Sequence, residues 1–303
     1  MNWVFLALSS SCLFAILVIA DKWLLSTYLP RLKTFFFLIG IFQIVMAAVI
    51  LLIEPWHSNP TPYVLTIGLL SALSWCFGVL LMFYGVSRLE VSRVIPITHI
   101  SPVFVGIMAV MFLKEHLSPL TWIAILVTIG GAILVAMGQG HSKRNNGPPI
   151  IYLAVMAGSL LTAIANVTFK YALTGIEFWN ITALNSLCAA LVFMAVGWSS
   201  HTVSDIRLLA SSKIGTVVFV LAEIVLAPAA IVLMFAAFSA GPASLVSTVI
   251  STRPLFVLII TGLLSTGYLN LLDEPINRKN LPGKLFPILM IVAGVTTITM
   301  SQG

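Results

Sequence analysis

The chain has 303 residues, of which 60% are hydrophobic and only 8% are charged. Soluble domains are about 45–50% apolar and about 25% charged, so this chain has too few polar side chains to cover a water-facing globule. The composition excludes a soluble enzyme and a disordered chain, and it predicts a polytopic membrane protein. The formal net charge of +6 comes from scattered Lys and Arg residues rather than from one basic face, which excludes a nucleic-acid partner.

Ten apolar runs follow one another along the chain, separated by short polar connections. A bilayer core about 30 Å thick needs about 20 apolar residues for each spanning helix. The runs are continuously apolar rather than alternating, which favours helices over a barrel. They cover residues 3–20, 34–53, 63–86, 94–113, 119–138, 149–169, 178–198, 214–238, 243–264 and 285–301. The predicted fold is an all-α polytopic membrane protein with ten transmembrane helices.

The second half of the chain repeats the first. Several sets of residues recur in the same order, among them Leu81-Met82-Phe83 as Leu233-Met234-Phe235. We therefore expect residues 1–140 and 149–303 to form two five-helix repeats. Because five is an odd number, the second repeat enters the membrane in the opposite orientation, which gives the inverted repeat of many secondary transporters. Such folds bind their substrate near the middle of the bilayer, between the repeats.

A loose family motif spans the fourth and fifth runs. Ser101-Pro102-Val103-Phe104-Val105 is followed by Phe112-Leu113-Lys114-Glu115-His116-Leu117-Ser118-Pro119-Leu120-Thr121-Trp122 and by a helix containing Gly130-Gly131. This pattern resembles the EamA type of the drug/metabolite transporter superfamily, in which each half ends with a Pro-containing fourth helix, a Gly-Glu-like turn and a Gly-rich fifth helix. The resemblance implies a transporter with five helices in each half. The second half departs from it in a longer polar stretch, Gly267 to Gly283, interpreted as a surface loop or, alternatively, as a gating or partner element.

Ionisable residues inside apolar runs are costly to bury and mark functional sites in membrane proteins. Arg253 lies near the middle of the ninth run, directly before Pro254, and a guanidinium binds carboxylate or phosphate through paired hydrogen bonds. We interpret Arg253 as an anion clamp, with a structural ion pair to Glu223 as the alternative. Glu223, in the middle of the eighth run, is a candidate proton carrier or partner of a substrate amine. His99, in the fourth run, is either a proton relay or substrate contact, or a helix-packing histidine.

The other candidates for the wall of a substrate cavity are polar or aromatic: Ser101, Asn166, Trp75 and Tyr84. Ser101 is the repeat counterpart of Arg253. Asn166 resembles the family's Asn position, and it either lines the cavity or bonds between helices. Trp75 and Tyr84 lie nine residues apart in one run and thus about 180° apart around its helix, so at most one of them faces a cavity. Proline frees a backbone carbonyl one turn earlier and lets a helix bend, which makes hinge candidates of Pro96, Pro102, Pro228 and Pro254.

No metal or organic cofactor is expected, because the His and Cys residues show no metal-ligand spacing. A proton is the coupling ion that Glu223 would carry. The sequence predicts a secondary active transporter, an exporter or exchanger of a small zwitterionic or anionic metabolite, that works by alternating access. The alternative is a flippase of a lipid-linked substrate. We expect no enzyme activity, a monomer or homodimer, and a location in the cell (inner) membrane.

The charge pattern and the family resemblance disagree about orientation. Most Lys and Arg residues fall in connections on the side opposite the two termini, and the positive-inside rule makes that side cytoplasmic. The charge count therefore places both termini outside, whereas the family it resembles has them in the cytoplasm.

Overall fold

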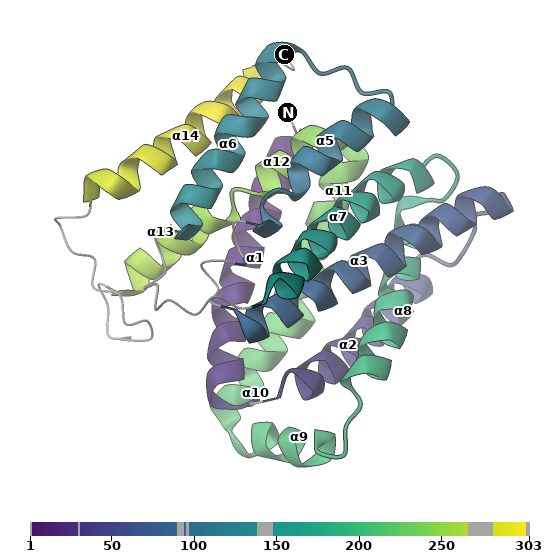
Figure 1. Ribbon diagram of the computed structural model, residues 1–303. Helices are drawn as coiled ribbons and strands as arrows, with labels where there is room; N and C mark the ends of the chain where they lie inside the picture. Colours follow the sequence, from purple (N-terminus) through teal and green to yellow (C-terminus); the bar gives the residue numbers. More distant parts are fainter. Residues whose placement is uncertain are drawn as a thin grey trace.

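The computed structural model of the chain describes residues 2–29, 31–89, 94, 97–137, 148–265 and 281–300. Every regular element in these ranges is a helix (Figure 1). Helices satisfy their own backbone hydrogen bonds, which a chain in lipid requires. The elements are α1 (Asn2–Thr27), α2 (Leu32–Ile53), α3 (Pro62–Arg88), α5 (Ser101–Phe112), α6 (Pro119–Met137), α7 (Pro149–Ala172), α8 (Phe178–Gly197), α9 (Thr202–Ser211), α10 (Lys213–Val220), the π-helix η1 (Leu221–Leu226), α11 (Ala227–Ala240), α12 (Ala243–Ile250), α13 (Arg253–Ser265) and α14 (Leu281–Met300).

Seven helical segments of the described chain are long and apolar enough to cross a membrane, counting α10, η1 and α11 as one segment and α12 with most of α13 as another. Three shorter apolar helices fall in the remaining predicted runs: Ser101–Phe112, Pro119–Val135 and Phe286–Thr299. The protein is therefore an all-helical, integral, multi-pass membrane protein. The predicted stretch from Gly267 to Gly283 lies largely outside the described residues.

Large apolar side chains lie on the outside of the molecule. Phe5 of α1 is 73% exposed, Leu52 of α2 is 81% exposed and Leu191 in the middle of α8 is 71% exposed. A water-soluble protein rarely shows so much contiguous apolar surface. These side chains are expected to face lipid tails.

Helices from the two halves pack in pairs. The most extensive contacts join α3 to α7, α2 to α8, α6 to α14 and α1 to α11, and α5 packs against α12. At the α3–α7 crossing, a Cβ atom built on Gly158 would lie 3.1 Å from the carbonyl oxygen of Gly78. Small residues at such crossings let membrane helices approach closely. Each of these five pairs joins a helix of the first half to a helix of the second.

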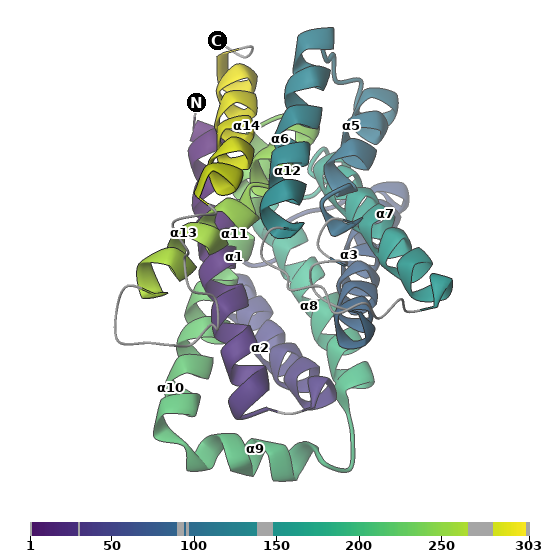
Figure 2. The same cartoon turned by 60° about the vertical axis from the view of Figure 1, so that its left-hand side comes forward.

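The two ends of the molecule differ. α1 begins and α14 ends at the same end of the bundle, while α9 crosses the opposite end (Figures 1 and 2). α9 lies between the predicted runs 178–198 and 214–238, in one of the polar connections. Its Asp205 accepts hydrogen bonds from Arg31 Nη1 and from Thr34 Oγ1, both at 2.6 Å. These contacts fasten α9 to the beginning of α2.

Candidate functional site

The ninth predicted run contains a break in its helix. α12 ends at Ile250, Ser251 and Thr252 form a turn, and α13 begins at Arg253. The next residue is Pro254, which fits a helix start because its missing N–H has no intrahelical partner there. Ser11 of α1 reaches the break: its Oγ donates to the Ile250 carbonyl at 3.1 Å and lies 3.4 Å from Thr252 Oγ1. α1 is thus tied to the start of α13.

The first half has a similar break. A turn that includes His99 precedes α5, which starts with Ser101 and Pro102. Ser101 and Pro102 are both buried. A turn therefore interrupts the helical run beside the proline in each half. The hinge candidate Pro96 lies outside the described residues.

Arg253 is a partly buried cation without a carboxylate partner in the described part of the chain. Its guanidinium carbon lies 4.4 Å from the centroid of the Phe14 ring of α1, a favourable but modest cation–π contact. Its Nε is buried and has no hydrogen-bond partner among the described residues. The ion pair found in those ranges joins Arg31 to Asp205 instead. The alternative of a structural Arg253–Glu223 ion pair is therefore not what the structure contains.

The other polar candidates differ in their surroundings. His99 lies close enough to Arg253 for the charge of the guanidinium to act on its ring. Asn166 of α7 is partly exposed, and no described residue forms a hydrogen bond with its side chain. Buried hydroxyl groups accompany Arg253 along α12 and the turn: Ser244, Ser247, Thr248, Ser251 and Thr252. The structure thus brings Arg253 and His99 together beside a hydroxyl-rich helix.

The two aromatic candidates lie away from this region. Trp75 of α3 packs on Phe193, with ring centroids 6.0 Å apart, in an aromatic cluster shared with α2 and α8. Tyr84 is 41% exposed, and the Arg88 guanidinium lies over its ring. This position is typical of an aromatic anchor at the membrane surface.

Glu223 lies in η1, where its neighbour is another carboxyl group. The side chains of Glu223 and Asp21 of α1 share a hydrogen bond. Asp21 is not among the predicted site residues, because the first predicted run ends at residue 20. The apolar residues Leu24 and Leu25 beyond it were the signal that the helix continues to Thr27.

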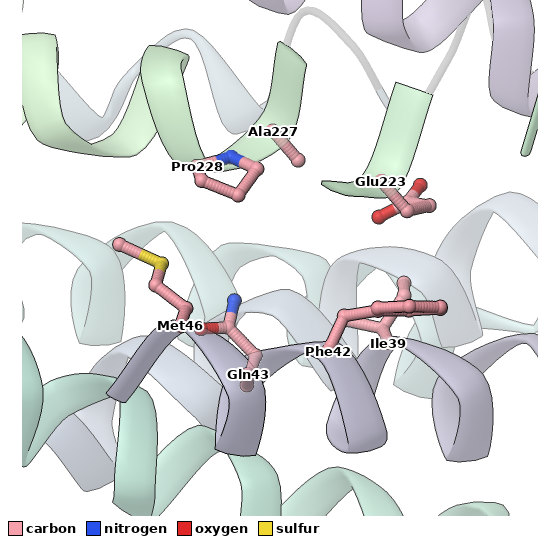
Figure 3. A pocket seen from close by; sticks show the side chains of 7 residues that line it. All are labelled: Ile39, Phe42, Gln43, Met46, Glu223, Ala227 and Pro228. Atoms are coloured by element: carbon pink, nitrogen blue, oxygen red, sulfur yellow. The ribbon is translucent and has the colours of Figure 1, made fainter. Parts of the chain in front are cut away.

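A small pocket opens beside Glu223, between α2 and the η1–α11 junction (Figure 3). The amide of Gln43, which is 8% exposed, points into it from α2. The hinge candidate Pro228 lies in the first turn of α11 and forms part of the wall. The apolar part of the lining consists of Ile39, Phe42, Met46 and Ala227.

Two charged residues hold the turn between α11 and α12. The Glu115 carboxylate accepts hydrogen bonds from the backbone N–H groups of Ala243 and Ser244 at 2.5 and 3.3 Å, and from Ser244 Oγ at 2.5 Å. Lys170 Nζ donates to the Phe238 carbonyl at 2.9 Å and also to that of Gly241. The acid caps the beginning of α12 and the lysine caps the end of α11. The Gly-Glu-like turn of the first half therefore binds a helix of the second half.

Comparisons with known proteins bear on family and fold. Residues 1–137 match the model of the EamA-like transporter family, which is part of the drug/metabolite transporter superfamily. The resemblance inferred from the motif is confirmed over residues 1–137.

An uncharacterized protein of Methanocaldococcus jannaschii is 32% identical over 76 residues, which are 25% of this chain and 56% of that protein. The chain thus spans about half the length of the curated relative it matches. One crystal structure of a protein covers 98% of this chain and 96% of its own, with a TM-score of 0.70 and 11% sequence identity. At 11% sequence identity, this similarity shows a shared fold and says nothing about function.

Proposed function

We propose that this integral membrane protein, whose residues 1–137 carry the pattern of the EamA-like transporter family, is a secondary transporter of a small anionic metabolite. It works by alternating access in the cell membrane, as an exporter or exchanger, with Arg253 as the group that binds the anion. Its ten spans form two inverted repeats, residues 1–140 and 149–303. No chemical step on the substrate is needed for this function.

The pairing of helices supports the inverted repeat. If the first five spans correspond to the second five, α1 corresponds to α7, and α3 to the segment from α10 to α11. The pair α3–α7 then corresponds to the pair α1–α11, and both pairs are among the most extensive contacts. The pairs α2–α8, α6–α14 and α5–α12 each map onto themselves. An even number of spans also fits the common end at which α1 begins and α14 ends (Figure 2).

One observation carries the substrate class: Arg253 is a partly buried guanidinium that no described carboxylate neutralises. A charge removed from water costs free energy unless a counter-charge or hydrogen bonds compensate for it. An anionic ligand would supply both, beside the beginning of α13, whose dipole also favours an anion. Glu223 is engaged with Asp21, so an α-amino acid held between Arg253 and Glu223 is disfavoured. We therefore choose an anion over a zwitterion.

A thermal-shift screen of the detergent-purified protein tests this proposal. Organic acids, phosphates, amino acids, sugars, amines and lipid head groups are compared. A ligand at 100 times its Kd stabilises the folded state by about 2.7 kcal/mol. We expect an organic acid or phosphate to raise the melting temperature of the wild-type protein but not that of Arg253→Ala. In Arg253→Lys the rise should be smaller, because lysine lacks the planar guanidinium that forms paired hydrogen bonds.

Arg88→Ala is the matched control, because Arg88 also lies over an aromatic ring but at the exposed end of α3. It should keep the full response. Stabilisation by lipid head groups alone, or an equal response in Arg253→Ala, would overturn the anion proposal. The first of these outcomes would favour transport of a lipid-linked substrate.

A further inference from the structure

Two carboxyl groups meet in the interior of the bundle. Asp21 projects from α1 and Glu223 from η1, and their side chains share a hydrogen bond. Glu223 is 5% exposed, and one oxygen of each carboxyl is buried without a hydrogen bond from any other described group. An ionised carboxylate only accepts hydrogen bonds. A hydrogen bond between two carboxyl groups therefore requires a proton on one of them.

No neighbouring cation takes the place of this proton in the described part of the chain. Charged and titratable groups on the helices around the pair lie elsewhere, and none is among the groups that act on either carboxyl: Cys12, Lys22, Tyr28, Lys33, Lys213 and Arg253. Lys22, Lys33 and Lys213 are exposed. The described residues hold no group of three or more potential metal ligands. Among the described residues, no basic side chain is thus placed to offset the negative charge of the pair.

The pocket beside Glu223 contains a second polar side chain. Gln43 points into the pocket from α2, and no described group forms a hydrogen bond with its side chain. The opposite wall is the junction of η1 and α11, where Pro228 provides no backbone N–H (Figure 3). Glu223 and the Gln43 amide thus line the same small pocket.

α1 links this pair to Arg253. Phe14, which lies under the Arg253 guanidinium, and Asp21 are seven residues apart in one helix. They therefore lie on nearly the same face of α1 and about 10 Å apart along it. Two ionised carboxylates at close range repel each other strongly away from water. Ionisation of both carboxyl groups would therefore displace α1, the same helix that contacts Arg253.

We propose that Asp21 and Glu223 together bind one exchangeable proton, and that its loss separates α1 from η1 and thereby couples proton movement to the anion site at Arg253. The proton site stands on the carboxyl contact itself. The coupling rests on the proposed transport function.

Infrared spectroscopy of the full-length purified protein tests the proton site without a ligand. At about pH 8, exposed Asp and Glu side chains are ionised. The C=O stretching band of a protonated carboxyl should be present in the wild type, shift in D₂O, and disappear reversibly at higher pH. It should be lost in the double variant Asp21→Asn/Glu223→Gln, which keeps the size of both side chains. The control Glu177→Gln, at an exposed position, should keep the band.

The wild-type spectrum alone is decisive if the double variant fails to fold. Absence of the band at about pH 8, or an unchanged band in a folded double variant, would overturn the proton site. Each single variant, Asp21→Asn or Glu223→Gln, should also lose the band, because the new amide donates to the remaining carboxylate and stabilises its ionised form.

The coupling is tested in vesicles with an anion found to stabilise the protein. Addition of that anion should move protons across the membrane with the wild type, and the double variant should lose this movement. Anion-induced stabilisation is measured separately on the same variant. If no anion stabilises the wild type while the infrared band is present, the proposal that Arg253 binds an anion is wrong, and the proposal of a proton site is still supported. If an anion binds but moves no protons with the wild type, the coupling is wrong.

Discussion

Glu115 and Lys170 show how single residues hold a helix-to-helix turn, and Glu115 also joins the first half to the second. Each binds backbone groups on one side of the turn between α11 and α12, and each comes from an element other than those helices. Unpaired N–H groups at a helix start and unpaired carbonyls at a helix end are costly in a low-dielectric interior. Placement of an acid at the N-terminus and a base at the C-terminus also matches the helix dipoles.

Replacement of Glu115 by Gln should destabilise the protein. The amide has nearly the shape of the carboxylate but lacks its charge and one acceptor, so the cap of α12 is weakened by about 1–2 kcal/mol. The apparent melting temperature in detergent measures the effect. Glu177→Gln, at an exposed acid that makes no side-chain cap, should leave it unchanged. Equal melting temperatures for the two variants would contradict a capping role for Glu115.

At the residue scale, the cost of burial alone identifies candidate site residues in the sequence. Arg253, Glu223 and His99 stand out in apolar runs because burial of a charge demands a reason. Their partners could not be predicted in this way. Glu223 pairs with Asp21 from the opposite end of the sequence, and the Arg253 ring contact is with Phe14, one of 18 phenylalanines and without any sequence signal.

At the scale of elements, glycine positions decide how closely paired helices approach. Gly130 and Gly131 are adjacent in α6, yet they face different surroundings. A Cβ on Gly131 would meet the Pro287 carbonyl oxygen of α14 at 2.8 Å, whereas a Cβ on Gly130 would meet only the flexible end of Met290 at 3.4 Å. The Gly-rich motif is visible in the sequence, but the glycine that contacts the partner helix depends on the rotation of α6.

These neighbours provide a matched pair of substitutions. Gly131→Ala should destabilise the protein by about 1–3 kcal/mol, because backbone of α14 must move to admit the methyl group. Gly130→Ala should be neutral or stabilising by up to about 1 kcal/mol, because alanine favours the helix. Melting temperatures of the two purified variants give the comparison. Similar losses in both would mean that the α6–α14 contact does not depend on this close approach.

Element boundaries were predicted less well than element positions. The ten apolar runs all contain apolar helices. The first predicted run ends at residue 20, whereas α1 continues to Thr27. In the eighth run the sequence predicted a hinge at Pro228 but not the π-helix that precedes it. α9 also went unpredicted, because its ten residues are too polar for a span and form a helix held by Asp205.

At the scale of the whole molecule, the halves depend on each other. The main helix pairs join one half to the other, so a separated half would leave its packing faces uncovered. This dependence follows from the order of pairing, which the sequence repeat alone does not reveal. Repeat matches relate α3 to the α10–α11 segment, whereas the structure packs α3 on α7.

Expression of the two halves as separate chains tests this arrangement. Residues 1–140 and residues 149–303 should each be degraded or aggregate when expressed alone, since lipid cannot satisfy the polar contacts between them. Co-expressed halves should associate, and a tag on one half should recover the other after detergent extraction. Recovery of either half alone as a stable, folded protein would contradict the pairing as the basis of the fold.

The π-helix carries a consequence for the descent of this protein. In η1 the N–H of Ala227 bonds to the carbonyl of Ala222, five residues earlier, where an α-helix would bond to the fourth. The stretch thus holds one residue more than an α-helix would. Deletion of a single codon there would restore an ordinary helix and leave both flanking segments facing their present neighbours. If the deleted residue preceded Glu223, the deletion would also turn the Glu223 carboxyl by up to about 100°. One such event would suffice to gain or lose the acidic pair in a lineage.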